Sequence, residues 1–325
     1  MRCPVCDHDN RLSAKFCKKC GAALLQTPQS VPKATSPQPD PQPTVTPAPS
    51  RSEDPTHYTA EINRRHPACF IFLIDQSASM RDRMAGSKPK QSKADGVADQ
   101  INRLLAELIA QNSLDAEIID RVYVSVIGYG ARVGPAFGGA LADRDLLPIS
   151  EVAVNYASLS RSGSFPVWFE PVAEGGTPMG SAMRQAIDVA SRWVAEHPTD
   201  MDFPPIVMNI TDGEANQDDQ PDGHARRLTD LATGNGNILL FNLHLSEDSG
   251  NPVMFPDSPD RLNARFAMQL FALSSVLPPP MRRLAANEGF GEITGNSRGF
   301  VYNADMTALI KFIDIGTRPN PGALR

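Results

Sequence analysis

Residues 68–80 read ACFIFLIDQSASM, in which seven apolar residues pass directly into the polar segment DQSASM. An unbroken apolar run of this length is typical of a β-strand that is buried on both faces. Ligands of open α/β sheets bind beyond the carboxyl ends of the strands. The acidic and hydroxyl side chains that follow this run, at Asp75, Ser77 and Ser79, are therefore candidates for a binding site.

Apolar runs of the same kind recur along the chain, with helix-like patterns between them. Further strands are predicted at 122–127, 206–210, 238–243 and 299–302. Helices are predicted after an N-cap at Ser92, and at about 180–195, 222–234, 262–274, 279–287 and 304–313. Strands that alternate with helices favour an α/β fold with a parallel sheet and right-handed crossovers.

The composition of the 325-residue chain narrows the class of protein. Hydrophobic residues make up 41% of it, which excludes a wholly disordered chain, and the formal charge of −6 argues against a general nucleic-acid coat. No stretch reaches the roughly 18 uncharged apolar residues of a membrane span. The first four residues, MRCP, lack the hydrophobic region of a secretory signal. We therefore expect a cytoplasmic protein.

Composition also divides the chain into three zones and a short tail. Residues 1–25 carry four of the five cysteines, and five Lys or Arg residues against two Asp. Residues 26–66 are polar and hold nine prolines, which predicts a disordered linker. Residues 67–316 contain the alternating strands and helices, and 317–325 are expected to form a C-terminal tail.

Four cysteines near the N-terminus have the spacing of a zinc site. Cys3, Cys6, Cys17 and Cys20 form the pattern C-x2-C-x10-C-x2-C, and four thiolates are the ligands of structural Zn²⁺. A segment of about 20 residues cannot fold on its own core, so the metal would supply the folding energy. The segment resembles the short zinc ribbons at the N-termini of many prokaryotic regulatory proteins. Its basic residues leave nucleic-acid contact as an alternative, although a solvated charged face is the favoured interpretation.

Two further segments place oxygen donors at the expected ligand edge of the sheet. Residues 175–178 (GGTP) offer a hydroxyl on a loop before a helix, and residues 211–214 (TDGE) place a second carboxylate after the strand 206–210. The pooled donors are all oxygen atoms, a set that suits Mg²⁺, Mn²⁺ or Ca²⁺ and argues against zinc here. Taken singly, several of these residues are equally consistent with helix N-caps.

Together the three motifs resemble the von Willebrand factor A (vWA) domain. D-x-S-x-S after a buried strand, G-T-P before a helix and T-D-G-E after another strand follow that family's order within residues 67–316. The resemblance implies a doubly wound, mostly parallel, Rossmann-like sheet with helices on both faces. It also implies a metal-ion-dependent adhesion site (MIDAS), at which a partner's Asp or Glu completes the coordination of a divalent cation. Matched by motif position, the ligands are Asp75, Ser77, Ser79, Thr177 and Asp212.

Two features depart from the family pattern. Ala78 stands where the family often has Gly, which leaves the ligands unchanged. The connection over residues 81–91 is longer and more basic than is common, and its charges would pair with acidic residues of a partner. A flexible solvated loop is the alternative interpretation. The residues predicted to form a partner-binding rim are Arg81, Arg83, Lys88 and Glu214.

Sequence motifs for catalysis are absent. The six histidines have no H-E-x-x-H context, and no P-loop or G-x-S-x-G elbow occurs. His244 is interpreted as a structural histidine, Cys69 as an inert core thiol, and residues 128–130 (GYG) as a turn. We therefore expect a binding protein without enzymatic activity.

The sequence as a whole favours a metal-dependent adaptor for protein–protein interaction. Residues 127–129, 147–150 and 303–317 also resemble, more loosely, segments of certain bacterial vWA proteins. Those proteins accompany kinases and phosphatases in stress or defence systems. Three alternatives stay open. They are a zinc-ribbon nucleic-acid or transcription-associated adaptor, a vWA co-chaperone subunit of an AAA+ ATPase, and a metal-dependent hydrolase.

Overall fold

The computed structural model describes most of the chain after residue 56. The described residues are Arg2, His8, Asp9, Lys19, 57–85, 91–115, 117–159, 165–246 and 251–317. The four cysteines of the predicted zinc ribbon, Lys88, and most of the predicted linker and tail lie outside them. The chain divides into two units, Met1–Ser52 and Glu53–Arg325. The fold and the candidate site described below belong to the second.

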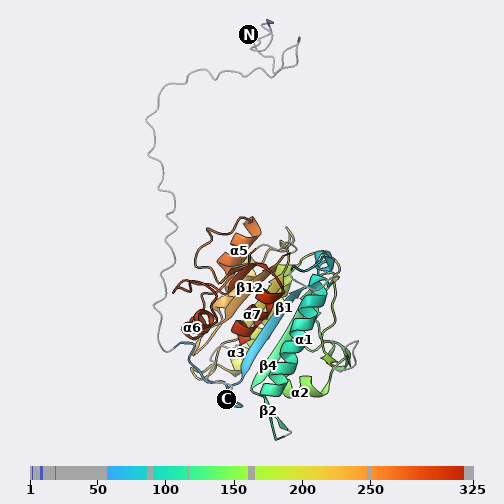
Figure 1. The fold of residues 1–325 in the computed structure, drawn as a ribbon, viewed down its shortest axis with the longest axis vertical. Helices are drawn as coiled ribbons and strands as arrows, with labels where there is room; N and C mark the ends of the chain where they lie inside the picture. Colours follow the sequence, from blue (N-terminus) through green and yellow to red (C-terminus); the bar gives the residue numbers. More distant parts are fainter. Residues whose placement is uncertain are drawn as a thin grey trace. The chain divides into compact units, whose positions relative to one another are not determined.

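A mostly parallel sheet forms the centre of the second unit (Figure 1). Its strand order is β13-β14-β12-β9-β1-β4-β5, with β6 also paired to β4. The parallel strands are β1 (Ala68–Asp75), β4 (Val122–Tyr129), β9 (Ile206–Thr211), β12 (Leu239–Leu245) and β14 (Phe300–Ala304). The antiparallel additions are β5 (Val133–Pro135), β6 (Leu147–Pro148) and β13 (Val253–Met254).

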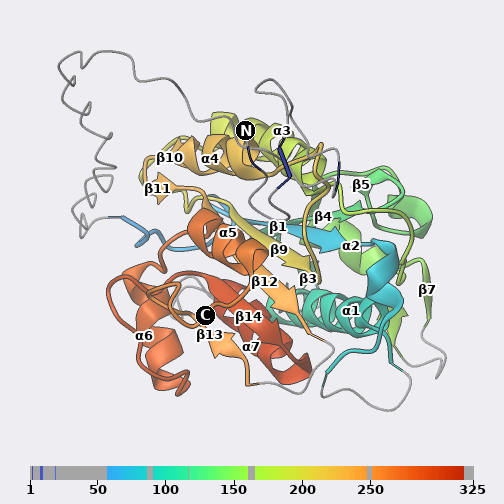
Figure 2. The same ribbon diagram turned by 90° about the horizontal axis from the view of Figure 1, so that it is seen from above.

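Helices cover both faces of this sheet, and Figure 2 shows α3 and α4 on one side and α1 and α7 on the other. One face carries α1 (Lys93–Gln111), α2 (Ile149–Val154), α6 (Pro279–Asn287) and α7 (Met306–Thr317). The other carries α3 (Met179–Glu196), α4 (Asp222–Asp230) and α5 (Arg265–Leu273). Within the described residues, no helix has the length and apolar character needed to cross a membrane. The predicted α/β fold, a mostly parallel sheet with helices on both faces, is confirmed.

Short elements complete the unit. Two turns of 3-10 helix are η1 (Ala78–Arg81) and η2 (Gly139–Leu141). Three two-stranded ribbons pair β2 (Ser113–Leu114) with β3 (Glu117–Ile118), β7 (Ser158–Leu159) with β8 (Pro166–Val167), and β10 (Ala232–Thr233) with β11 (Gly236–Asn237).

The two faces of β1 explain its continuous apolar sequence. Successive side chains of a strand point to opposite faces of the sheet. Phe70, Phe72 and Ile74 therefore join the core beneath α1 and α7, whereas Ile71 and Leu73 join the core beneath α3. Cys69 belongs to the second core as a buried free thiol, and burial raises its pKa well above the ordinary value, which agrees with its interpretation as inert.

Two local predictions were wrong. The helix predicted at 222–234 ends at Asp230, because Leu231 is extended (φ −68°, ψ 143°) and the chain then enters the ribbon β10–β11. The turn predicted at 128–130 is instead the end of β4, because Tyr129 pairs in parallel register with Asp75.

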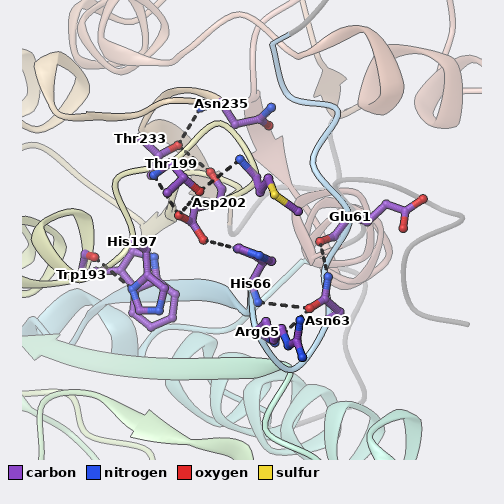
Figure 3. A network of polar contacts seen from close by, with 11 residues as sticks. Glu61, Asn63, Arg65, His66, Trp193, His197, Thr199, Asp202, Thr233 and Asn235 are labelled. Carbon is purple, nitrogen blue, oxygen red and sulfur yellow. Dashed lines mark hydrogen bonds and ion pairs between the residues drawn. The ribbon is translucent and has the colours of Figure 1, made fainter.

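The segment that leads into β1 is fastened to the domain by hydrogen bonds (Figure 3). Nδ1 of His66 lies 2.7 Å from Oδ1 of Asp202, whose other oxygen accepts from the Thr199 hydroxyl at 2.6 Å. The amide of Ala60 donates to the side chain of Asn235 at 3.2 Å, and Ile62 is buried. Residues 57–66, which fall within the predicted linker, thus pack against the N-terminal ends of the strands.

The order of the strands marks one edge of the sheet as the expected binding edge. The chain passes from β1 through α1 to β4 on one side of β1, and then through α3 to β9 on the other side. Because α1 and α3 cover opposite faces, the strand order reverses beside β1. Such a reversal opens a crevice at the carboxyl ends of the flanking strands, here those of β1 and β9.

Candidate metal centre

Four of the five predicted MIDAS ligands converge at this edge of the sheet. Asp75 is the last residue of β1, and its Oδ1 accepts the Ser77 amide at 2.8 Å. The Ser77 and Ser79 hydroxyl oxygens lie 3.0 Å apart. Ser79 donates to Oδ1 of Asp212 at 2.8 Å, across 133 residues of sequence. Residues from two strand ends therefore meet in one hydrogen-bonded group.

The loop that carries Thr177 is held against the D-x-S-x-S turn by backbone hydrogen bonds. The amide of Glu174 donates to the carbonyl of Gln76 at 2.6 Å, and the amide of Ala78 donates to the carbonyl of Gly175 at 3.0 Å. The amide of Gln76 in turn donates to the Tyr129 carbonyl at 2.7 Å. Thr177, which is 8% exposed, is thereby brought to the same edge as the other predicted ligands.

Asn216, which the sequence analysis missed, fixes the backbone of Thr177. Its side-chain Oδ1 accepts the backbone amide of Thr177 at 2.9 Å, and its backbone amide donates to the Thr177 carbonyl at 3.0 Å. Asn216 lies four residues after Asp212, so it joins the loop after β9 to the loop before α3. The only sequence signal of a role for Asn216 was its position shortly after the T-D-G-E motif. That position did not indicate its contact with Thr177.

The Asp75 carboxyl is buried, 1% exposed. Burial raises the pKa of Asp75 to about 6, against the lowering effect of hydrogen bonds from Ser77 and Thr211. The Thr211 hydroxyl donates to Oδ2 of Asp75 at 2.6 Å. Within the described part of the chain no Lys or Arg forms an ion pair with this carboxyl. A bound cation would offset this cost of burial, because burying an uncompensated charge is unfavourable.

The donor set fits a hard divalent cation. Carboxylate and hydroxyl oxygens are the ligands that Mg²⁺, Mn²⁺ and Ca²⁺ prefer. Ser77 is buried at the base of the group, whereas Ser79 is exposed, so the group is open to solvent on one side. Among the described residues, no cluster of three or more His, Cys, Asp or Glu forms an alternative metal site.

A buried lysine contacts the same group, which the sequence analysis also missed. Nζ of Lys93 lies 2.8 Å from Oδ2 of Asp212, and the two side chains are 3% and 0% exposed. Lys93 is the first residue of α1, and its own amide donates to the Asp82 carbonyl at 2.9 Å. A charged residue at the start of a helix ordinarily indicates a solvated position, so the sequence offered no signal of this contact.

His244 supports the Asp212 backbone. Its Nε2 lies 3.2 Å from the Asp212 carbonyl, and its ring stacks on Tyr302 and contacts Phe266. Burial lowers the pKa of His244 to about 4, so the ring is neutral at pH 7 and Nε2 carries the donated proton. A structural part for this histidine agrees with the sequence interpretation.

The predicted rim residues that are described are exposed and lie close in sequence to the predicted ligands. Arg81 and Arg83 are exposed at the end of η1, and Arg83 pairs with Ser92 in an isolated bridge. Glu214 is exposed and lines an open pocket of about 590 Å³ together with Arg265 and Phe266. Lys88 lies outside the described residues, as do the predicted zinc ligands Cys3, Cys6, Cys17 and Cys20.

Comparison with known proteins finds similarity in structure alone. No protein-family model matches the chain, and no curated protein matches it in sequence. Proximal thread matrix protein 1 of the mussel byssus, described with a zinc-occupied MIDAS motif, is 12% identical over 78% of this chain and 48% of its own, with a TM-score of 0.43. This chain thus spans about half the length of the mussel protein.

Two prokaryotic structures are similar at the same distant level. BatB from Bacteroides thetaiotaomicron is 16% identical over 76% of this chain and 97% of its own, with a TM-score of 0.38. The ArnB paralog VWA2 from Sulfolobus acidocaldarius is 12% identical over 55% of this chain and 35% of its own, with a TM-score of 0.30. The solved structures similar to this chain therefore include vWA proteins, and the likeness is one of fold.

Proposed function

We propose that residues 67–316 form a vWA domain that binds a divalent cation and, through it, a carboxylate of a protein partner. The observation that carries the proposal is the convergence of Asp75, Ser77, Ser79 and Asp212 at the reversal of strand order. The Thr177 loop is fastened to the same turn by backbone hydrogen bonds. A cation such as Mg²⁺ held by these residues would leave a coordination position for an incoming Asp or Glu side chain.

The residues themselves perform a binding function. The buried Asp75 and the exposed Ser79 both present oxygen donors, and hydrogen bonds from Asn216 fix the Thr177 backbone. We propose no enzymatic turnover, because His244, which contacts the Asp212 backbone, is neutral and donates to a carbonyl. Arg81 and Arg83 would contact acidic residues that flank the partner's carboxylate.

The wider setting of the proposal rests on the sequence. Four clustered cysteines would bind Zn²⁺ in an N-terminal ribbon, which fits a reducing, cytoplasmic compartment. The partner would be a protein rather than a nucleic acid, and a kinase- or phosphatase-linked stress or defence system is the setting that the sequence resemblance implies.

Binding of Mn²⁺ to the full chain tests the metal site. We expect wild-type protein to reduce the free Mn²⁺ signal in electron paramagnetic resonance and Asp75→Ala to lose most of this binding. Asp188→Ala, which removes an exposed carboxylate from α3, is the matched control and should bind as the wild type does. Equal binding by the Asp75 and Asp188 variants would refute the assignment.

Partner capture in Mg²⁺ then tests the adaptor function. The wild type and Asp188→Ala should retain a protein from lysate that Asp75→Ala does not. Retention by all three would show that this edge of the sheet is not the recruiting surface.

A further inference from the structure

The position of Lys93 is unusual in two respects. Lysine is almost never fully buried unless it is paired, yet Lys93 is 3% exposed. The N-terminus of a helix carries a partial positive charge and disfavours cations, yet Lys93 is the first residue of the 19-residue helix α1. A residue that breaks local rules without a compensating contact would be selected against. The ion pair with Asp212 is one such compensating contact.

Local structure fixes the lysine in this place. Ser92 accepts the Asp95 amide at 3.1 Å, and Asp95 accepts the Ser92 amide in return at 3.2 Å, which completes a capping box at the start of α1. The Lys93 amide donates to the Asp82 carbonyl, so the first turn is also joined to the segment that follows η1. The lysine therefore reaches Asp212 from a helix start that is held on both sides.

The Asp212 carboxylate has two different partners. Its Oδ1 accepts the Ser79 hydroxyl at 2.8 Å, and its Oδ2 contacts Nζ of Lys93 at 2.8 Å. Asp75, the other carboxyl of the group, has no cationic partner among the described residues. Among the described residues, the buried group thus contains two carboxylates and one ammonium, and together these three carry one negative unit when both carboxylates are ionised.

We propose that Lys93 is a fixed counter-charge of the metal centre, which weakens binding of the cation and strengthens binding of an anionic ligand to the cation-loaded site. The inference rests on the proposed function and concerns the same site. With the lysine, a divalent cation leaves one net positive charge, which a carboxylate ligand neutralises. Without it, the loaded site is already neutral, and a carboxylate adds an excess negative charge. In a poorly solvated group such differences change affinities by about tenfold or more.

The test uses the full chain at one fixed pH and Mn²⁺ as the probe. Lys93→Met removes the charge with little change in volume, Lys93→Gln removes it but keeps a hydrogen-bond donor, and Lys93→Arg retains it. Lys311→Met removes one charge from α7, where Lys311 lies 4.9 Å from the Phe290 ring centroid, and serves as the matched control for net charge. Asp75→Ala reports separately on the metal site itself.

Three measurements distinguish the outcomes. We expect both neutral variants to bind Mn²⁺ at least about tenfold more tightly than wild type by electron paramagnetic resonance. Their melting temperature in EDTA should fall, because Asp212 loses its buried partner, and it should rise further on adding Mn²⁺ than that of wild type. Acetate should displace water from the bound Mn²⁺ less readily in these variants, as measured by solvent proton relaxation. Lys311→Met should behave as wild type, and Lys93→Arg, which keeps the charge, should bind Mn²⁺ less tightly than the two neutral variants.

The proposal and the proposed function fail in different ways. If Asp75→Ala abolishes Mn²⁺ binding while both neutral Lys93 variants match Lys311→Met in Mn²⁺ and acetate affinity, the metal site stands and the counter-charge is refuted. If wild type binds no Mn²⁺ but a neutral Lys93 variant does, the lysine is confirmed as the opposing charge. If none of the proteins binds Mn²⁺, the proposed function and this inference are both refuted.

Discussion

Gly130 lies where three backbone segments of the candidate site meet, and replacing it with alanine should weaken metal binding. A Cβ at this position would lie 2.5 Å from the carbonyl oxygens of both Gln76 and Glu174. Ordinary van der Waals contact begins at 3.4 Å, so the oxygens would have to retreat by about 0.9 Å. Both belong to the loops that carry the predicted ligands, and neither is the end of a flexible side chain that can swing away.

The size of the effect follows from this geometry. Overpacking of this kind costs about 1–3 kcal/mol of folding free energy, which lowers the melting temperature of a unit of this size by roughly 2–4 °C per kcal/mol. Binding sites tolerate displacements of only about 0.5 Å, so we expect Gly130→Ala to bind Mn²⁺ at least roughly tenfold more weakly than wild type.

A second glycine supplies the control for this experiment. Gly134, on the neighbouring strand β5, has open space where an alanine would place its Cβ, with nothing within 4 Å, so Gly134→Ala should leave stability and Mn²⁺ affinity almost unchanged. Affinity is measured by electron paramagnetic resonance and stability by thermal melting in EDTA. If Gly130→Ala binds Mn²⁺ as tightly as Gly134→Ala does, the loops contacted by Gly130 do not position the ligands, and the reasoning is wrong.

Three further predictions follow from buried polar groups. The pKa of Asp75 is raised to about 6 in the fold, against an ordinary value of 3.8, so between these values the folded state binds more protons than the unfolded state. In EDTA, the free energy of unfolding should therefore fall by about 2 kcal/mol as the pH rises from 4 to 7, and denaturant titrations of Asp75→Asn should lack this loss. Asn102 is 4% exposed, accepts the amides of Trp168 and Phe169 and donates to two carbonyls, so Asn102→Leu should cost about 2–4 kcal/mol in urea unfolding; a cost below about 1 kcal/mol would contradict this account. The pKa of Asp202 is lowered, because hydrogen bonds from Thr199 and His66 outweigh the effect of its desolvation. The ionised carboxylate therefore stabilises the fold, and this stabilisation is lost as the pH falls through the pKa of Asp202 in the folded state. Below about pH 4, the melting temperature should fall more steeply for wild type than for Asp202→Asn.

The fold was predictable from the sequence because its strongest signals are local. The run 68–74 is apolar at every position, since β1 is buried on both faces, and helix–strand alternation indicated the parallel sheet. The helix predicted at 222–234 shows the limit of such signals. Its apolar pattern continues past Asp230, but Leu231 is extended and the ribbon begins at Ala232, next to which the Thr233 hydroxyl donates to the distant Asp202 carbonyl.

The candidate site was predictable only where its residues lie in motifs. Asp75, Ser77 and Ser79 are close in sequence. Because they follow a buried strand, the sequence indicated that they lie at the carboxyl edge of the sheet. Lys93 and Asp212 are separated by 119 residues, and neither position carries a pattern that pairs them. Their contact depends on the docking of the α1 N-terminus beside β9, which only the three-dimensional structure reveals.

The fastening of residues 57–66 at the N-terminal ends of the strands has a practical consequence for presenting the protein on a surface. β1 begins directly after this segment and is eight residues long, ending at Asp75, so the point of entry and the candidate metal centre are separated by roughly 23 Å along the strand. If the protein were attached to a biosensor chip through an affinity tag ahead of residue 57, the attachment point would lie at the end of the domain opposite the candidate metal centre. The edge that carries the candidate metal centre would then face the flowing solution, where it would be accessible to a protein partner.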